Sequence, residues 1–302
     1  MARVNRLIAL LEQDQPTFGE RVPSLGYEAG VVAAETPYDY LIVEFEHQPF
    51  DMGGLRAYMR GLVDGGPTRS GHRTPPVLVT LPVTGISADA VRTNAWQLAH
   101  VLAAGVHGVI LCHAEAAEAV RALVSHARYP FNTPDADDGT VGRRGGGGQG
   151  DAAAIWGLSV AEYLAKADPW PLNPAGELLL AVKIENARGL ANCHDILAVP
   201  GVGMAEWGPG DIGMSLGPRF FPPGYAPDPY FAPDSPYGAA IRESWRLVRE
   251  ACLANRVALY RTMRPEDWRV LYASGVRSSS VSAHTDGFIN DLRRLAGRAM
   301  PW

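Results

Sequence analysis

The chain has 302 residues, 47% hydrophobic and 20% charged, so it can bury a large core without a disulfide or metal staple. Its formal net charge is −5 and both signs are spread along the chain. This excludes the basic stripe of a nucleic-acid binder and the polybasic run of a membrane-surface protein.

The N-terminal segment 1–15 (MARVNRLIALLEQDQ) has the pattern of an amphipathic helix with acidic residues, which neither a signal peptide nor a transit peptide carries. No apolar run reaches the roughly 18–20 residues that a membrane span requires. Cys112, Cys193 and Cys252 lie far apart without CxxC spacing. We therefore expect no disulfide or zinc ribbon, and a cytoplasmic location.

Short apolar, β-branched runs alternate with helix-period segments, as in a parallel sheet wrapped by helices. Helices are predicted between the strands, for example at 92–105, 115–127 and 185–199. Eight strands are the number that closes a (β/α)8 TIM barrel, here as one domain spanning 1–302. The eight predicted strands are 17–23, 40–46, 76–81, 108–113, 177–185, 201–208, 257–262 and 278–284.

Two stretches interrupt this rhythm. Residues 130–150 are rich in Gly, Asp and Pro, and residues 217–238 are dense in Pro and aromatic side chains. Because barrel-type segments continue on both sides of each stretch, we predict long loops over one rim of the barrel. Such loops are often lids or binding loops.

Charged residues stand at three predicted strand ends, where side chains of a barrel point into the active-site mouth. They lie in the segments 44–47 (EFEH), 183–185 (KIE) and 208–211 (GPGD). Period-two alternation puts Lys183 and Glu185 on one face. A cation between Glu185 and Asp211 would offset the cost of burying carboxylates, and two carboxylates suit Mg²⁺ or Mn²⁺. Alternatively, both acids only cap helices.

These motifs resemble those of the HpcH/HpaI aldolase and citrate lyase family, which has an acidic-x-Glu-His strand end, a later Ile-Glu and a Gly-Pro-x-Asp motif. Further similar segments are NRLIALLE near the start, AGVHGVILCHAEAAEAVRAL in the fourth βα unit, ARYP at 127–130 and GRRG at 142–145. The likeness covers most of residues 4–217, in the family's order. It implies a barrel of the phosphoenolpyruvate/pyruvate type.

The resemblance also implies a class II aldolase mechanism. Glu185 and Asp211 would bind Mg²⁺ or Mn²⁺, or else Co²⁺, and the metal would stabilise the enolate of a pyruvate-like 2-oxo acid. His47, next to Glu46, would transfer a proton at the aldol hydroxyl. Gly208 and Pro209 would help to hold the carboxylate of the oxo acid. The expected substrates are a small 2-oxo acid and an aldehyde, and the expected assembly is a homo-oligomer, either a hexamer or a trimer of dimers.

The chain departs from the family pattern at two positions. Thr80 stands where family aldolases have the arginine of strand three that binds the pyruvyl oxygens, and Ala103 replaces the aspartate that orients the histidine. Lys183 stands where the family has glutamine, and we hypothesise that its ammonium partly replaces the arginine. A lysine here also raises the alternative of Schiff-base chemistry.

Two more residues are candidate substrate contacts. His113 ends the fourth strand and either faces the mouth or simply begins a helix; Arg144 lies in the GRRG loop and either binds an anionic substrate or is solvated. Besides an aldolase or retro-aldolase for 4-hydroxy-2-oxo acids, the sequence permits a decarboxylase or CoA-ester lyase of the same family. A barrel that has lost catalysis and kept a regulatory role is a further alternative.

Overall fold

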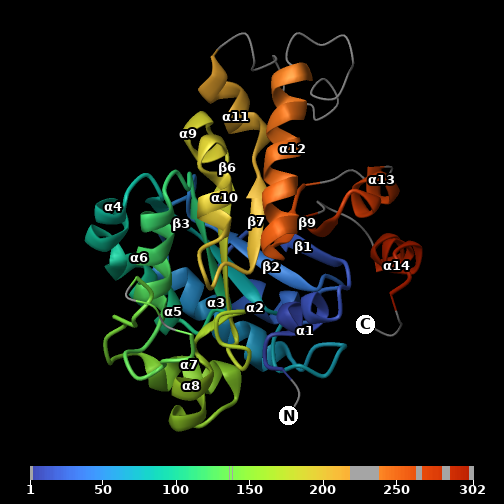
Figure 1. The fold of residues 1–302 in the computed structure, drawn as a ribbon. Helices are drawn as coiled ribbons and strands as arrows, with labels where there is room; N and C mark the ends of the chain where they lie inside the picture. The colour runs from blue at the N-terminus through green and yellow to red at the C-terminus, as the bar shows by residue number, and fades with distance from the viewer. Residues whose placement is uncertain are drawn as a thin grey trace.

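The computed structural model describes residues 3–135, 137, 139–217, 238–262, 267–280 and 286–298, and within them a parallel barrel surrounded by helices (Figure 1). The sheet order is β4-β3-β2-β1-β9-β8-β7-β6-β5, and β4 also pairs with β6, which closes eight strands into a ring. The short β5 is an extra strand at the edge of β6. The predicted (β/α)8 barrel is confirmed. The strands are β1 (Thr17–Arg21), β2 (Tyr40–Glu44), β3 (Val77–Thr84), β4 (Gly108–Cys112), β5 (Pro169–Trp170), β6 (Leu178–Ile184), β7 (Met204–Trp207), β8 (Ala258–Tyr260) and β9 (Val276–Ser280).

Helices that follow the strands surround the barrel on its outside (Figure 1). The predicted helix at 92–105 is in fact two, because Asn94 turns its side-chain amide onto the carbonyl of Ala90 and ends the first. The helix predicted at 185–199 breaks at Asn192 in the same way, with its amide on the carbonyl of Glu115. The helices are α1 (Arg6–Glu12), α2 (Tyr27–Ala33), α3 (Met52–Gly65), α4 (Ala88–Thr93), α5 (Ala95–Ala103), α6 (Ala117–Ala127), α7 (Gln149–Trp156), α8 (Val160–Lys166), α9 (Ala187–Ala191), α10 (Cys193–Leu197), α11 (Pro209–Leu216), α12 (Gly238–Asn255), α13 (Trp268–Ala273) and α14 (Asp286–Leu295).

The inside of the barrel is apolar at its N-terminal end. Leu7 and Ile8 of α1 close this end, where Asn5 caps the helix by accepting hydrogen bonds from both of their backbone N–H groups. Alternate residues of a strand share a face, so the inward-facing side chains of each strand follow one another toward its C-terminal end. At that end of the barrel the inward-facing side chains are charged instead of apolar. The apolar inner layer consists of Leu7, Ile8, Tyr40, Ile42, Leu78, Ile110, Leu179, Ala181, Met204 and Tyr260.

The loop predicted at 130–150 lies at the N-terminal end of the barrel, not over the mouth. It joins the end of α6 to α7, and the backbone N–H of Arg144 donates to the carbonyl of Arg128 there. This position follows from the helix before the loop, which runs away from the mouth. The prediction that both long loops cover one rim stays a prediction. The other predicted loop, 217–238, falls almost entirely on residues 218–237, outside the described residues.

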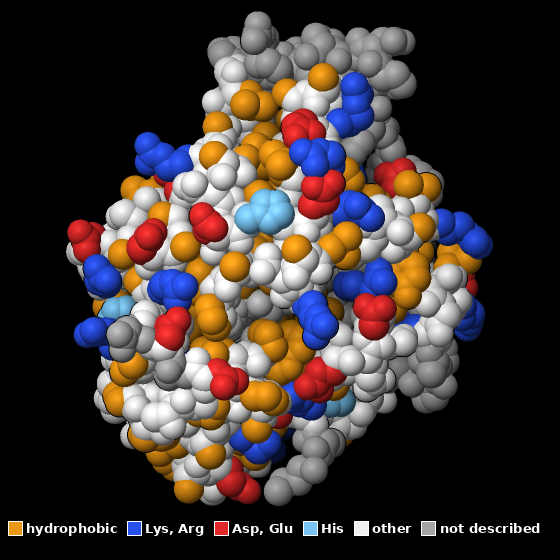
Figure 2. All heavy atoms as spheres, in the orientation of Figure 1, with side chains coloured by type: hydrophobic (Ala, Val, Ile, Leu, Met, Phe, Trp, Pro, Cys, Tyr) orange, Lys and Arg blue, Asp and Glu red, His pale blue; other side chains and the backbone are white. Residues whose placement is uncertain are grey.

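Charges of both signs are interspersed on the face drawn in Figure 2 and do not gather into one basic patch there. Among the described residues, none of the helices combines the length and the apolar character needed to cross a bilayer.

A buried carboxylate ties the C-terminal helix to the base of the barrel. Asp39 is 1% exposed, accepts hydrogen bonds from Arg293 at 2.9 Å and from Arg298, and also accepts the N–H of Phe18. Arg6 lies 3.8 Å from the same carboxylate. Burial raises the pKa of Asp39, but these three guanidinium groups outweigh burial and the net pKa is lowered.

We expect Asp39→Asn to lower the free energy of unfolding by about 3–5 kcal/mol, since it leaves buried arginines without their counter-charge. Urea denaturation followed by circular dichroism measures this. The control is Asp291→Asn on the exposed face of α14, where the pair with Arg294 should contribute less than about 1 kcal/mol. An equal loss of unfolding free energy in the two variants would contradict the stabilising role given to Asp39.

Candidate active site at the barrel mouth

A buried ion pair lies at the C-terminal end of the barrel interior. Lys183, on β6, is 5% exposed, and its ammonium donates a hydrogen bond to Glu46, which follows β2. Register brings the two strands to the same end of the barrel although 137 residues separate the partners in sequence. The mouth therefore contains a cation that is already bound to a carboxylate.

Lys183 stays protonated in this setting. Burial lowers its pKa, but the negative charges around it, with Glu206 first and Glu185 and Glu46 among the others, raise it more, so that the net pKa lies above the ordinary value. A Schiff-base lysine needs the opposite, a depressed pKa that frees the amine at neutral pH. The electrostatics of the mouth therefore disfavour Lys183 as a nucleophile.

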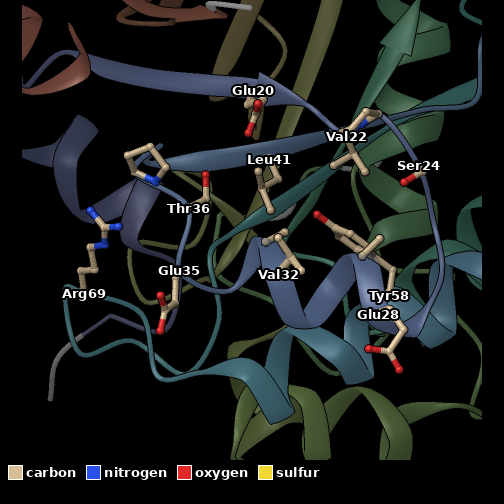
Figure 3. A pocket seen from close by; sticks show the side chains of 14 residues that line it. Glu20, Val22, Ser24, Glu28, Val32, Glu35, Thr36, Leu41, Tyr58 and Arg69 are labelled. Atoms are coloured by element: carbon tan, nitrogen blue, oxygen red, sulfur yellow. The ribbon is translucent and has the colours of Figure 1, made fainter. Parts of the chain in front are cut away.

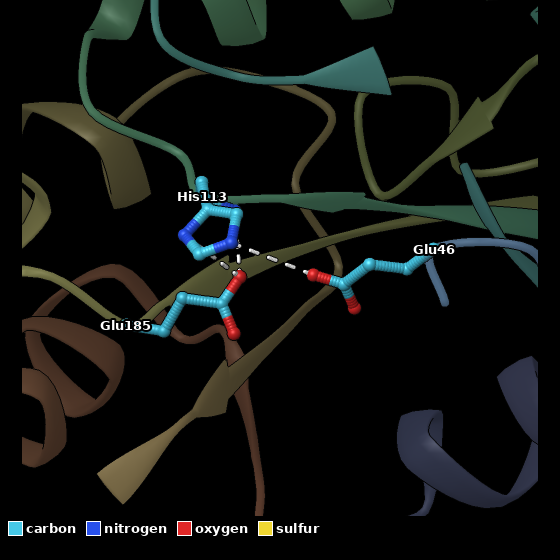
Figure 4. A group of neighbouring side chains, drawn as sticks. All are labelled: Glu46, His113 and Glu185. Atoms are coloured by element: carbon cyan, nitrogen blue, oxygen red, sulfur yellow. Dashed lines mark hydrogen bonds and ion pairs between the residues drawn. The ribbon is translucent and has the colours of Figure 1, made fainter. Parts of the chain in front are cut away.

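Glu185 and His113 lie against each other beside this pair (Figure 4). The backbone N–H of His113 donates to Glu185 Oε1 at 2.7 Å, and His113 Nδ1 lies 3.6 Å from the same oxygen. His113 adopts a left-handed backbone conformation with φ of 47°, which is uncommon for a residue with a side chain. The turn after β4 is thus held so that its N–H points at the carboxylate.

The carboxyl group of Glu185 has an unusual proton affinity. It is 2% exposed, and burial raises its pKa to about 8, with Glu46 and Glu206 adding to the rise and Lys183 opposing it. With no cation beside it, the carboxyl group tends to keep its proton. A divalent cation beside it would instead keep it ionised.

Glu46, His113 and Glu185 form the one group of three potential ligands that the described residues place with ligand atoms within 4.8 Å of one another. Glu46 Oε1 is buried, makes no hydrogen bond to a described residue, and lies 3.6 Å from His113 Nε2. The backbone of Gly208 packs directly against Glu185, since a Cβ at this position would lie 2.7 Å from Glu185 Cβ and 3.0 Å from its Oε2. A buried, unpaired carboxylate oxygen beside a second buried carboxylate fits a hard divalent cation.

Asp211 lies in the first turn of α11, which begins directly after Gly208 with Pro209 in its first turn. The strand–Gly-Pro turn brings the start of this helix against Glu185, as the sequence motif predicts. Asp211 is partly exposed, and its carboxylate is not among the three clustered groups. Its predicted role as the second metal ligand, and the predicted substrate contacts of Gly208 and Pro209, stay predictions.

Thr80 is buried under the end of β2. Its hydroxyl donates to Glu44 Oε1 at 2.7 Å and accepts the N–H of Phe45 at 2.9 Å. With 1% of its surface exposed, Thr80 positions the strand end, while a contact with substrate stays a prediction. His47 is different, because its side chain is 65% exposed and its Nε2 lies 3.6 Å from Glu46 Oε2. That histidine therefore lies between solvent and the buried carboxylate.

Sequence reasoning missed two charged residues of the mouth. Glu206, on β7, has a pKa raised by burial, with Lys183 and Arg21 opposing the rise. Arg21 ends β1 and donates to Glu44 Oε2 at 3.0 Å. The alternation of faces along a strand could have found them, because residues two apart lie on the same face. Glu206 lies on the face of Gly208. Arg21 lies on the face of Gly19, next to which the ring of Tyr40 packs.

Arg144 does not reach this mouth from within its own chain. Its guanidinium donates to the hydroxyl of Tyr163 at 2.8 Å and stacks over the ring of Tyr129 at 4.5 Å, near the N-terminal end of the barrel. The alternative of a solvated side chain does not hold, since Arg144 is buried, and its predicted contact with an anionic substrate stays a prediction. The GRRG segment lies in the loop between α6 and α7, and the guanidinium of Arg144 packs against the rings of Tyr129 and Tyr163.

A large cavity also lies away from the charged cluster. It measures about 560 Å³ and lies between α2 and the outer faces of β1 and β2, lined by Leu41, Val32 and Tyr58 with acidic residues at its edge (Figure 3). None of the clustered acids of the mouth lines it. Cavity size alone does not locate the chemistry of this protein.

The sequence pattern of the HpcH/HpaI aldolase/citrate lyase family matches residues 31–220, which is more than half of the chain. The chain belongs to this family. As a member of the HpcH/HpaI family it is an enzyme, a lyase of the aldolase class, which confirms the resemblance read from the strand-end motifs.

Relatives of known activity agree with this assignment. A hydroxypyruvate/pyruvate aldolase of Paraburkholderia phytofirmans is 30% identical over 214 residues, covering 70% of this chain and 71% of the relative. A 2-keto-3-deoxy-L-rhamnonate aldolase of Klebsiella pneumoniae is 29% identical, covering 62% of this chain and 57% of the relative. A solved HpcH/HpaI family protein of Burkholderia cenocepacia, 22% identical, has the same fold with a TM-score of 0.69 over 97% of this chain and 98% of that one.

The raised pKa of Glu185 predicts a stability effect in protein stripped of metal. Because the folded-state pKa of about 8 exceeds the ordinary 4.5, ionisation opposes folding and stability falls as pH rises through this window. We expect Glu185→Gln to increase the free energy of unfolding by roughly 1–3 kcal/mol at about pH 8.5 and little at about pH 5.

Urea denaturation in EDTA at both pH values measures the gain. Glu118→Gln, on the exposed first turn of α6, is the control and should change stability little at either pH. A gain for Glu185→Gln that is absent at the higher pH, or larger at the lower one, would show that the carboxyl group is not held against its ionisation.

Proposed function

We propose that this protein is a metal-dependent aldolase that cleaves or forms 4-hydroxy-2-oxo acids. The observation that supports this most is the pairing of a buried carboxyl, Glu185, whose pKa is raised to about 8, with a second buried carboxylate, Glu46, that has a free oxygen. Family membership and the named aldolase relatives support the same reaction class.

Glu185 and Asp211 would hold the divalent cation, which we propose to be Mg²⁺, Mn²⁺ or Co²⁺. A related fold, the citrate lyase beta subunit of Mycobacterium tuberculosis, 16% identical with a TM-score of 0.52, was solved with oxaloacetate and magnesium. A bound cation supplies Lewis-acid stabilisation of the negative charge that develops on the oxygens of a 2-oxo acid. The N–H groups at the start of α11, by Gly208 and Pro209, would favour the carboxylate of that acid.

Lys183 orients the proton-transfer group. Its ammonium fixes Glu46 Oε2, which leaves Oε1 directed at His113 and Glu185 (Figure 4). We propose that the Glu46 carboxylate accepts the proton of the aldol hydroxyl and that the exposed His47, whose Nε2 lies 3.6 Å from Glu46 Oε2, relays it to solvent. The charge of Lys183 would also stabilise an oxo-acid carboxylate, as a point charge in place of the bidentate arginine that Thr80 replaces.

We further propose a cytoplasmic homo-oligomer, a hexamer or trimer of dimers. All three cysteines are buried free thiols, which suits a reducing compartment. We propose small molecules, and neither a nucleic acid nor a membrane, as its partners.

A retro-aldol screen of 4-hydroxy-2-oxo acids, coupled to lactate dehydrogenase, tests the activity. We expect turnover that EDTA abolishes and that Mg²⁺ or Mn²⁺ restores. Glu185→Gln and Asp211→Asn should each lower kcat/KM by about 100-fold or more, since even the outer partners of metal ligands are worth about 10–100-fold. Asp195→Asn, exposed on α10, is the control. Activity that persists in EDTA and in Glu185→Gln would exclude the proposal.

The role of Lys183 is tested separately. Lys183→Ala should lower kcat/KM for the 2-oxo acid by about 10–1000-fold, because the buried Glu46 loses its counter-charge. Borohydride with substrate should leave no adduct on the wild-type enzyme. A trapped adduct on Lys183, or unchanged kcat/KM in the alanine variant, would overturn the role given to this residue.

A further inference from the structure

The imidazole ring of His113 faces both buried carboxylates of the mouth (Figure 4). Its Nδ1 lies 3.6 Å from Glu185 Oε1, and its Nε2 lies 3.6 Å from Glu46 Oε1. Both separations are longer than an ordinary hydrogen bond, which joins a nitrogen and an oxygen at about 2.7–3.2 Å. The ring therefore presents one nitrogen to each acid at more than hydrogen-bond distance.

The backbone holds this ring in place. His113 follows β4 in a left-handed conformation with φ of 47°, and its N–H donates to Glu185 Oε1 at 2.7 Å. Glycine adopts this conformation without strain, whereas a residue with a side chain is strained there. A strained backbone that carries an imidazole to the charged mouth indicates a use for the ring.

Glu46 is placed to orient the ring. Lys183 binds Oε2 of this carboxylate, while the buried Oε1 makes no hydrogen bond to a described residue. A neutral imidazole carries one N–H and one lone pair, so a ring whose Nε2–H is directed at Glu46 turns the lone pair of Nδ1 toward Glu185. Histidine ligands of metals commonly donate the N–H of their second nitrogen to a carboxylate in this way.

The separation of His113 Nδ1 and Glu185 Oε1 fits two ligands of one cation. Atoms that lie about 2.0–2.2 Å from a metal ion, at an angle of about 90–110° to each other, are roughly 3.0–3.6 Å apart. The 3.6 Å found here lies at the upper end of that range. Glu46 competes less well for the same cation, because the ammonium of Lys183 already offsets its charge.

We propose that His113 is a further protein ligand of the divalent cation, through Nδ1 and next to Glu185, and that this nitrogen gives the site a preference for Co²⁺ or Zn²⁺ over Mg²⁺. This rests on the proposed function, which assigns the cation to Glu185 and Asp211. Imidazole nitrogen suits transition metals, whereas Mg²⁺ takes oxygen ligands and keeps several waters. The ring of His113 thus decides which cation the mouth selects.

Pulsed electron paramagnetic resonance of the Mn²⁺-loaded protein tests for the bond itself. The wild-type protein should show the hyperfine coupling of a directly bound nitrogen, and His113→Gly should lose it. Glycine and asparagine both tolerate a left-handed turn, so His113→Asn is a second variant that keeps the backbone and removes the imidazole. His47→Asn, at a mouth histidine outside the ligand group, is the control and should keep the coupling. No coupling in the wild type, or coupling that survives in His113→Gly, overturns the proposal.

Isothermal titration tests the preference among cations. The wild-type protein should bind Co²⁺ more tightly than Mg²⁺. His113→Gly should weaken Co²⁺ binding by about 10–100-fold and Mg²⁺ binding by less than about 3-fold, because only the transition metal gains from the nitrogen. Free imidazole should restore part of the Co²⁺ affinity of His113→Gly. Equal losses for the two cations overturn the nitrogen ligand.

The outcomes also separate this inference from the proposed function. Neither the nitrogen coupling nor the selective loss of Co²⁺ binding requires turnover. If both appear and no 4-hydroxy-2-oxo acid is cleaved, the aldolase proposal fails and the histidine ligand stands. Metal-dependent cleavage by a protein that lacks the coupling supports the aldolase and overturns the role of His113.

Discussion

The arrangement of the mouth depends on the buried ion pair between Lys183 and Glu46. A carboxylate that loses contact with water must be paired or protonated, and three acids approach one another at this end of the barrel. The single ammonium of Lys183 keeps Glu46 ionised, as the lowered pKa of that carboxyl shows, whereas burial leaves Glu185 with a pKa of about 8. The same fold thus provides one carboxylate, Glu46, that is ionised before the reaction and able to accept a proton, and another, Glu185, whose charge depends on a ligand.

A second set of contacts fixes the rim of the mouth. Thr80 occupies the place of the family's arginine and turns its hydroxyl onto Glu44, and Glu44 holds Arg21 from the neighbouring strand. Arg21 thus places a half-exposed positive charge at the rim of the mouth, on the wall of the cavity between the loops that follow β1 and β2.

The sequence was sufficient for the barrel and the family because both depend on local patterns. Eight short β-branched runs predict the barrel, and the motifs at the strand ends predict the family; the structure confirms the first and the comparisons confirm the second. Contacts between distant segments could not be predicted from the sequence. No spacing of residues shows that Lys183 binds Glu46 or that Arg21 binds Glu44. Nor does it show that the GRRG loop lies at the opposite end of the barrel. The breaks at Asn94 and Asn192 were missed because an asparagine side chain competes with the helix only when its partner is in place.

The central claim is that the buried carboxylates of the mouth hold a catalytic divalent cation. The most direct test is anomalous diffraction from crystals grown with Mn²⁺ and pyruvate. We expect one strong peak in the mouth at about 2.0–2.3 Å from a carboxylate oxygen of Glu185, with Asp211 as the second protein ligand. A fully occupied Mn²⁺ site elsewhere on the protein, with density at Glu185 that shows no ion, would contradict the account.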